Sequence, residues 1–289
     1  MLPKEILKKV KLLEISTRKM VNNLFAGEYH TVFKGRGLTF ADFREYVPGD
    51  DIRSISWNLT AKAGKPFVKR YDEERELTLI LAVDVSSSGD FGSGSFLKGE
   101  VLVQLAAVLS FAAAKNNDRV GLLLFSDQVE HFVPPKKGRG HVHRILRDLL
   151  YFKPKGRKTN IKLALDTLTG LLKKKSTVFI LSDFLAQGFE RSLSLVARKH
   201  DVVAIVVEDF AEKQLPKMGI VDIQDAETGE IFTVDTSSSA FRRQYEQHYK
   251  KVKTLRDQQL TKSKVDRIDV DTSHGFVDPL IKFFSSRHR

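Results

Sequence analysis

The stretch LTLILAVDVSSS, residues 77–88, decides the fold class of this chain. Its first seven residues form an unbroken apolar run, which is typical of a strand that is buried on both faces. Polar residues follow at once, beginning with Asp84. In a parallel sheet that is covered by helices, functional loops gather where such strands end. The stretch therefore predicts a central strand that carries a polar loop at its carboxyl end.

Apolar runs and helical patterns alternate along the rest of the chain. Three further runs, at 120–125, 177–181 and 202–207, are expected to be buried strands. The helical patterns fall at 96–116, 141–151, 160–174, 189–199, 237–262 and 276–286. Strands that alternate with helices predict an α/β fold with a doubly wound, mainly parallel sheet of the Rossmann type. Three smaller features are also expected: an antiparallel edge strand at 129–133, a hairpin insertion near 219–235 and a late strand at 264–270.

The first 75 residues follow a different pattern. Apolar residues at three- and four-residue steps between 3 and 25 predict an amphipathic helix. A second helix is expected at 52–64, after a turn at 48–51, and Gly64 would end it; residues 66–75 look extended. We therefore expect a small α+β extension at 1–75 and a larger domain at 76–289.

Composition limits the classes of protein. Of the 289 residues 42% are hydrophobic and 29% are charged, as in ordinary globular proteins. The sequence contains no cysteine, which excludes disulfides, zinc–thiolate sites, iron–sulfur clusters and cysteine nucleophiles. It shows neither a targeting signal nor an apolar run of the roughly 20 residues that a membrane span needs. We therefore expect a cytoplasmic protein without a transmembrane segment.

Basic residues outnumber acidic ones by 48 to 36, which gives a net charge of +12. Such an excess favours acidic protein partners, anionic lipid or nucleic acid. Lysines and arginines are densest at Lys136, Lys137, Arg139, Arg144, Arg147, Lys153, Lys155, Arg157 and Lys158.

Three polar loops carry the candidate site. Asp84, Ser86 and Ser88 follow the first strand, Thr159 precedes the helix at 160–174, and Asp183 follows the run at 177–181. Because the carboxyl ends of parallel strands meet at one edge of the sheet, these side chains are expected to lie close together. Hydroxyl and carboxylate oxygens are hard ligands that suit Mg²⁺ or Mn²⁺.

The order Asp-x-Ser-x-Ser resembles the metal-ion-dependent adhesion site of von Willebrand factor A domains. The resemblance implies that Ser86, Ser88 and Thr159 bind the ion directly. It also implies that Asp84 and Asp183 hold coordinated water and orient the hydroxyls. An open coordination position would then accept an Asp or Glu side chain of a protein partner, toward which the basic residues that end at Lys158 would steer it.

A second resemblance covers the N-terminal part. The residues that carry it are Gly35-Arg36-Gly37-Leu38-Thr39-Phe40, Arg44-Glu45-Tyr46-Val47-Pro48-Gly49-Asp50-Asp51, Arg53, Ile55, Trp57 and Pro66-Phe67-Val68-Lys69. This signature is similar to that of the bacterial family called domain of unknown function 58, whose members place it just before an A-type domain. Family members are typically encoded beside MoxR-type AAA+ ATPases. The resemblance therefore implies an adaptor or co-chaperone of such an ATPase.

Enzyme motifs are missing from the loops. A haloacid dehalogenase-type phosphatase needs a second aspartate where Ser86 stands, and no phosphate-binding Gly-x-x-x-x-Gly-Lys motif occurs. We expect a non-enzymatic module without a small-molecule substrate. Two alternatives stay open: an acidic-site metallohydrolase that uses Asp84 and Asp183, and a nucleic-acid-binding protein. The latter would use residues 136–158 and a basic helix with Arg242, Arg243, Lys250, Lys251, Lys253 and Arg256.

Overall fold

The computed structural model describes residues 10–17, 20–21, 37–74 and 77–287. The chain divides into two compact units, residues 33–77 and the remainder, 1–32 with 78–289. Residues 10–17 are helical and pack within the larger unit, where Glu14 Oε2 lies 3.0 Å from Nε2 of His143 in helix α5 (Arg139–Tyr151). The sequence pattern grouped residues 1–75 as one region, whereas the smaller compact unit is 33–77.

The smaller unit is a β-hairpin with a helical connection. Strands β1 (Gly37–Glu45) and β2 (Phe67–Glu74) pair antiparallel, with a bulge between Phe40 and Asp42. The single helix expected at 52–64 is wrong, because a 3₁₀ turn, η1 (Ile52–Ser54), and helix α3 (Trp57–Ala63) replace it. The backbone between them is drawn into the hairpin, since Ile55 bridges to Val68 and the Ser56 N–H donates to the Phe67 carbonyl at 2.8 Å. Gly64 ends α3 in the left-handed conformation, as expected.

Six strands form one sheet in the described part of the larger unit. They are β3 (Thr78–Asp84), β4 (Arg119–Phe125), β5 (Val129–Lys136), β6 (Thr177–Ser182), β7 (Asp201–Glu208) and β10 (Asp266–Asp271). Their order is β10-β7-β6-β3-β4-β5, and only the edge pair β4–β5 among them is antiparallel. The doubly wound, mainly parallel sheet predicted from the sequence is confirmed. The chain moves outward from β3 first on one side and then on the other, so the switch in strand order lies beside β3.

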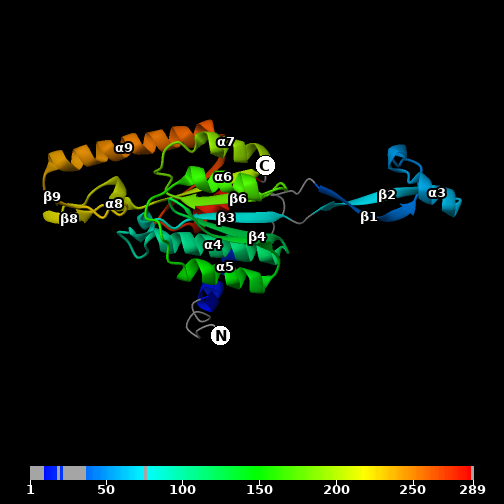
Figure 1. The fold of residues 1–289 in the computed structure, drawn as a ribbon, viewed down its shortest axis with the longest axis horizontal. Coiled ribbons are helices and arrows are strands. Elements are labelled where there is room, and N and C mark those ends of the chain that lie inside the picture. The colour runs from blue at the N-terminus through cyan, green and yellow to red at the C-terminus, as the bar shows by residue number, and fades with distance from the viewer. Residues whose placement is uncertain (1–9, 18–19, 22–36, 75–76, 288–289) are drawn as a thin grey trace. The chain divides into compact units, whose positions relative to one another are not determined.

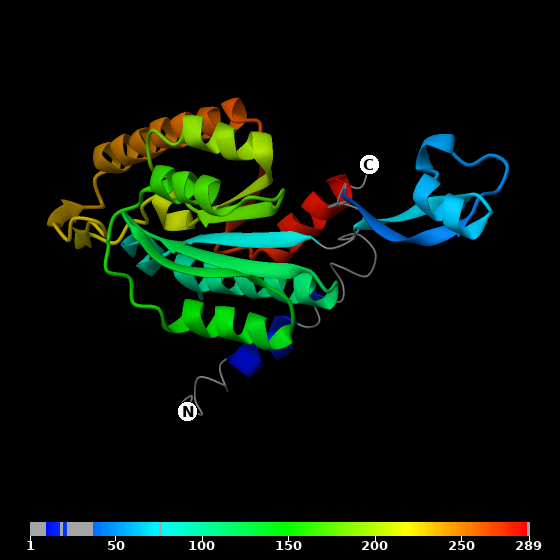
Figure 2. The same ribbon diagram turned by 45° about the vertical axis from the view of Figure 1, so that its right-hand side comes forward.

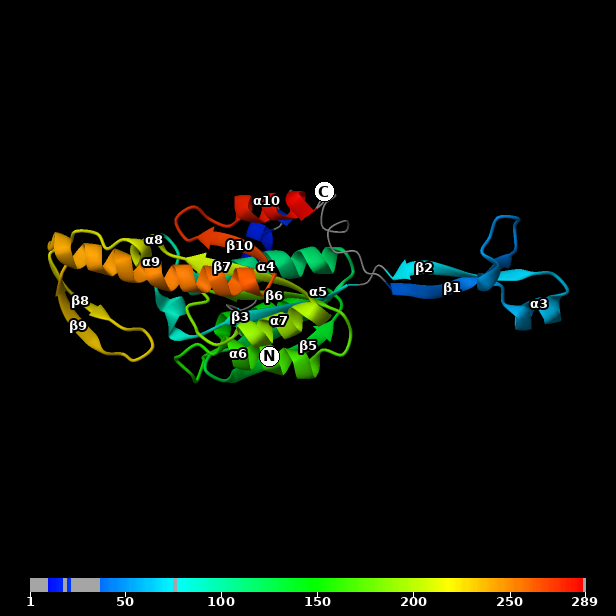
Figure 3. The same ribbon diagram turned by 90° about the horizontal axis from the view of Figure 1, so that it is seen from above.

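Helices cover both faces of this sheet. Their bounds are α4 (Lys98–Lys115), α5, α6 (Ile161–Leu171), α7 (Glu190–Lys199), α9 (Ser239–Lys262) and α10 (Val277–Arg287). Figure 1 shows α6, α7 and α9 on one face and α4 and α5 on the other. Figure 3 shows α10 beside the edge strand β10. Among the described residues, no helix is both long and apolar enough to cross a membrane.

The core confirms the prediction that β3 is buried on both faces. Residues 79–83 are at most 1% exposed. Ile80 and Ala82 share one cluster with Leu165 of α6 and Val196 of α7. Each fully buried aliphatic side chain of this kind contributes about 1.5–3 kcal/mol. This packing fixes the carboxyl end of β3, from which the candidate site begins.

A second hairpin follows β7 and a short helix, α8 (Phe210–Lys213). Its strands β8 (Ile220–Gln224) and β9 (Ile231–Asp235) pair antiparallel, which agrees with the hairpin expected at 219–235. Asp225 Oδ1 accepts hydrogen bonds from the N–H groups of Glu227 at 2.9 Å and Thr228 at 2.7 Å, so the turn is held by its own side chain. Figure 2 shows this hairpin at the end of the sheet where β3 and β6 finish.

Candidate functional site

Asp84 ends β3 and organises the loop that follows. Its Oδ1 accepts the Ser86 N–H at 2.9 Å, and its Oδ2 accepts the hydroxyl of Ser182, at the end of β6, at 2.7 Å. The residue is 4% exposed. Both carboxylate oxygens thus accept hydrogen bonds from neighbouring polar groups and hold the start of the loop in place.

Three hydroxyl groups meet beside this carboxylate. Ser86 Oγ lies 3.1 Å from Ser88 Oγ, and Thr159 Oγ1 donates to Ser86 Oγ at 2.8 Å. The two loops that carry them are joined by the backbone, since the Ser87 N–H donates to the Arg157 carbonyl at 3.0 Å. Asn160 caps α6 through the Leu163 N–H at 3.0 Å, which places Thr159 at the start of that helix. We call Ser86, Ser88 and Thr159 the hydroxyl cluster of the site.

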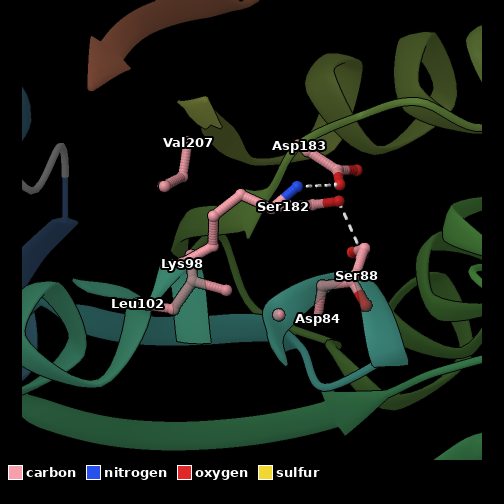
Figure 4. Close-up of a pocket in the computed structure, with 8 residues that line it drawn as sticks. Asp84, Ser88, Lys98, Leu102, Ser182, Asp183 and Val207 are labelled. Atoms are coloured by element: carbon pink, nitrogen blue, oxygen red, sulfur yellow. Dashed lines mark hydrogen bonds and ion pairs between the residues drawn. The ribbon is translucent and has the colours of Figure 1, made fainter. Parts of the chain in front are cut away.

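Asp183 completes the set expected from the sequence, and a lysine accompanies it (Figure 4). Asp183 Oδ1 accepts the Leu185 N–H at 3.2 Å, and its Oδ2 accepts Lys98 Nζ at 2.8 Å. The same ammonium donates to Glu212 Oε1 of α8 at 2.6 Å. Lys98 is only 2% exposed, so this is a buried ion triad that ties α4, the loop after β6 and α8 together.

Sequence reasoning missed Lys98 and Glu212. One signal for Lys98 was present: it lies three, four and seven residues before Val101, Leu102 and Leu105, all buried on α4. A lysine on the apolar stripe of a helix is rarely buried unless a carboxylate pairs with it. For Glu212 no comparable signal exists, since its partner is 114 residues away.

Charges within the site shift the pKa values of its members. Burial, together with the carboxylate of Asp183, raises the pKa of Asp84 to about 6. Burial acts to raise the pKa of Asp183 too, but the Lys98 ammonium holds it below its ordinary value. Burial alone would lower the pKa of Lys98, yet Asp183 and Glu212 raise it above its ordinary value. Lys98 therefore stays charged and keeps Asp183 ionised.

The donor set fits a hard divalent cation. It consists of hydroxyl and carboxylate oxygens, which Mg²⁺ and Mn²⁺ prefer. Within the described ranges no group of three or more His, Cys, Asp or Glu side chains could hold a metal ion. The binding of an ion at this place would thus depend on the neutral side chains of the hydroxyl cluster, assisted by Asp84 and Asp183.

Behind the site, Arg256 of α9 corrects one expectation. Its Nη2 lies 2.5 Å from Glu208 Oε1, its Nη1 donates to the Asp183 carbonyl at 3.2 Å, and the residue is 2% exposed. Lys253 Nζ donates to the same glutamate at 3.2 Å. The interpretation of Arg256 as part of a basic surface is therefore wrong, because it is a buried support for the loop of Asp183.

Comparisons with known proteins identify the family. The model of the family described as "Protein of unknown function DUF58" matches residues 42–255. An uncharacterized protein of Mycobacterium tuberculosis is 30% identical over 287 residues, which cover 97% of this chain and 89% of the relative.

Solved structures show more distant likenesses. The conserved hypothetical protein BatB from Bacteroides thetaiotaomicron is 16% identical, with a TM-score of 0.49, over 73% of this chain and 98% of that one. The SpRpn10 VWA domain is 12% identical, with a TM-score of 0.42, over 72% of this chain and 95% of that one. Both TM-scores lie below 0.5, so the assignment rests on the sequence matches alone. Those matches span nearly the whole chain, and the chain belongs to the family of proteins of unknown function DUF58.

Proposed function

We propose that this chain is a non-enzymatic, Mg²⁺-dependent protein-interaction module that binds an acidic side chain of a partner. One observation carries the proposal. The hydroxyls of Ser86, Ser88 and Thr159 meet beside Asp84, at the carboxyl ends of the strands where the strand order switches. Mn²⁺ would serve in the same place, since both ions favour oxygen ligands.

The contacts of the residues support the roles that the resemblance implies. Ser86, Ser88 and Thr159 would hold the ion, while Asp84 keeps the first loop in place through the Ser86 N–H. Lys98 neutralises part of the negative charge of Asp183, because its ammonium lies 2.8 Å from Asp183 Oδ2. Bound through neutral hydroxyls, Mg²⁺ would supply an electrophilic position that a carboxylate of a partner can fill.

The surroundings favour an acidic partner with apolar neighbours. Lys155, Arg157 and Lys158 are exposed on the loop before Thr159 and would steer negative charge toward the site. Phe91, Leu97 and Leu185 follow the other site loops and are each about 40% exposed. A partner segment with an Asp or Glu next to apolar side chains suits this combination of charge and apolar surface.

For the identity of the partner we rely on the family resemblance alone. Because members of the family are typically encoded beside MoxR-type AAA+ ATPases, we propose that this chain is an adaptor or co-chaperone of such an ATPase in the cytoplasm. The basic loop would then meet an acidic surface of the ATPase or of its client.

Affinity capture from a lysate of the native host tests the function. Wild type is used in Mg²⁺ and in excess EDTA, beside the Ser86→Ala and Ser87→Ala variants in Mg²⁺. Ser87 is the matched control, because it contacts the second loop through its backbone N–H. We expect a MoxR-type ATPase to be captured by wild type and Ser87→Ala in Mg²⁺ only. Partners retained in EDTA and by Ser86→Ala would refute a metal-dependent surface.

A further inference from the structure

The hairpin of β8 and β9 is exposed on both of its faces. No side chain of the two strands is buried, and Ile220, Ile231 and Phe232 are 75%, 65% and 51% exposed. Figure 3 shows the hairpin beyond the end of the six-stranded sheet. An isolated two-stranded hairpin is at best marginally stable in water, whereas a third strand stabilises it. The hairpin therefore has the form of an incomplete sheet.

The backbone of β8 leaves one edge of this small sheet unpaired. The Asp225 N–H donates to the Glu230 carbonyl at 2.8 Å, and the Thr236 N–H donates to the Gly219 carbonyl at 2.8 Å. Hydrogen-bonded pairs recur at every second residue of an antiparallel ladder, so the N–H and C=O groups of residues 220, 222 and 224 point away from β9. Within the described part of the chain, no hydrogen bond joins these groups to another segment.

The sequence of β8 does not protect this edge. Edge strands commonly carry proline or lysine, which keep other strands from pairing with them. The strand β5, at the edge of the large sheet, contains Pro134 and Pro135. In contrast, β8 reads Ile-Val-Asp-Ile-Gln, with three β-branched residues and neither proline nor lysine. The edge of β8 is thus a template for a further strand.

The charge of the hairpin determines which strand fits. Residues 218–236 contain five acidic residues and no lysine or arginine, in a chain whose net charge is +12. The five are exposed: Asp222, Asp225, Glu227, Glu230 and Asp235. Two such hairpins repel each other, which argues against a second copy of this chain as the added strand. A strand with lysine or arginine side chains is attracted instead.

The two faces of the hairpin set the pattern of the added strand. The pairing of the strands places only apolar side chains on one face, namely Val221, Ile223, Phe232 and Val234. The opposite face carries Asp222 and Asp235. Successive side chains of a strand point to opposite faces of its sheet. A strand that matches both faces therefore alternates apolar with basic residues.

We propose that the free edge of β8 binds a strand of a partner protein in which apolar residues alternate with lysine or arginine. The added strand completes a three-stranded sheet, with its apolar side chains beside Val221 and Ile223 and its basic side chains beside Asp222. This surface goes beyond the function proposed above, because it needs no metal ion and takes a partner segment of the opposite charge.

Fluorescence anisotropy of labelled peptides tests the proposal on the full chain, in EDTA. The probe peptide alternates lysine and valine. One control peptide alternates glutamate and valine, and a second carries the same lysines and valines in two separate blocks. We expect only the alternating lysine peptide to bind. Binding of the glutamate peptide, or equal binding of the block peptide, would overturn the proposal, since the latter would show attraction by charge alone.

Proline variants at the two edges identify the strand that binds. Gln224→Pro removes an N–H of the β8 edge, and Ile231→Pro, directly across the ladder, removes one of the β9 edge. Neither N–H belongs to the β8–β9 ladder, so both variants keep the hairpin. We expect Gln224→Pro to weaken binding of the probe by about tenfold or more and Ile231→Pro to leave it unchanged. Asp222→Asn should weaken it about two- to fivefold.

Two results with these variants would overturn the proposal. One is binding by Gln224→Pro equal to that of wild type, and the other is an equal loss in both proline variants. Sedimentation of the chain without peptide tests the other occupant. Self-association that Gln224→Pro abolishes would make a second copy the added strand and would also overturn the proposal.

Discussion

Replacing Lys98 by methionine tests the buried ion triad most severely. Methionine is of similar length and unbranched, so it can follow the path of the lysine stem beside Leu102 and Val207 (Figure 4). The change removes the ammonium and leaves Asp183 and Glu212 facing each other without a cation. Asp183 is 6% exposed, so water cannot easily replace the lost partner.

The structure sets the size of the expected effect. Lys98 Nζ makes two charge-assisted hydrogen bonds, at 2.8 Å to Asp183 and 2.6 Å to Glu212. Removing one partner of a buried ion pair costs about 3–5 kcal/mol, because it leaves an uncompensated charge. We expect Lys98→Met to lower the free energy of unfolding by that amount. The double variant Lys98→Met with Glu212→Gln is expected to recover part of the loss, since one unpaired carboxylate is removed.

Urea unfolding at neutral pH in EDTA, followed by circular dichroism, measures these differences. Lys162→Met is the control. The ion pair of Lys162 with Asp166 is similarly short, at 2.7 Å, but it lies on the surface, where Lys162 is 59% exposed. Its expected cost is below about 1 kcal/mol. If Lys98→Met costs no more than Lys162→Met at equal slope, the reasoning about the triad is refuted.

Three further results are expected. Burial acts to raise the pKa of Glu208, but Arg256 lowers it to about 2, so Glu208 should stabilise the fold by about 3 kcal/mol above pH 4.5. This stability is lost as the pH falls from 4.5 toward 2. Over this range the free energy of unfolding of Glu208→Gln should therefore fall less steeply with pH than that of wild type, and an equally steep fall would contradict the prediction. Gly121→Ala places a carbon 2.8 Å from Ile80 Cδ1 and 3.1 Å from the Val133 carbonyl, and should cost about 1–3 kcal/mol in thermal or urea unfolding, whereas a neutral effect would show a looser core. Charge reversal of Lys155, Arg157 and Lys158 together should weaken partner capture at low salt and little at high salt, and capture that does not change would speak against steering.

Much of the fold could be predicted because apolar runs report burial directly. Residues 79–83 of the run at 77–83 are buried, as a central parallel strand requires. The single helix expected at 52–64 was wrong for a reason that periodicity cannot show. Ile55 has helical spacing with Ile52 and Leu59, but its backbone pairs with Val68 instead. Tertiary pairing here outweighed a weak local preference.

For the candidate site, the strand order allowed the loops to be placed together, whereas the buried charge pairs could not be predicted. Ser86, Ser88 and Thr159 could be placed together because loops at one sheet edge meet. The triad of Lys98 and Glu212 could not, because the contacts of Lys98 join segments 85 and 114 residues apart. Metal binding by the hydroxyl cluster stays a prediction.

The central claim is that the hydroxyl cluster of Ser86, Ser88 and Thr159 binds a divalent cation. Paramagnetic broadening by Mn²⁺ tests this claim most directly. Trace Mn²⁺ is added to isotope-labelled chain, and the loss of each backbone amide signal is followed in wild type, Ser87→Ala and Thr159→Ala. We predict that broadening centres on residues 85–89, 158–160 and 183–185 in wild type and Ser87→Ala, and disappears from them in Thr159→Ala. Broadening that centres on another part of the chain, or that Thr159→Ala leaves unchanged, would contradict the account.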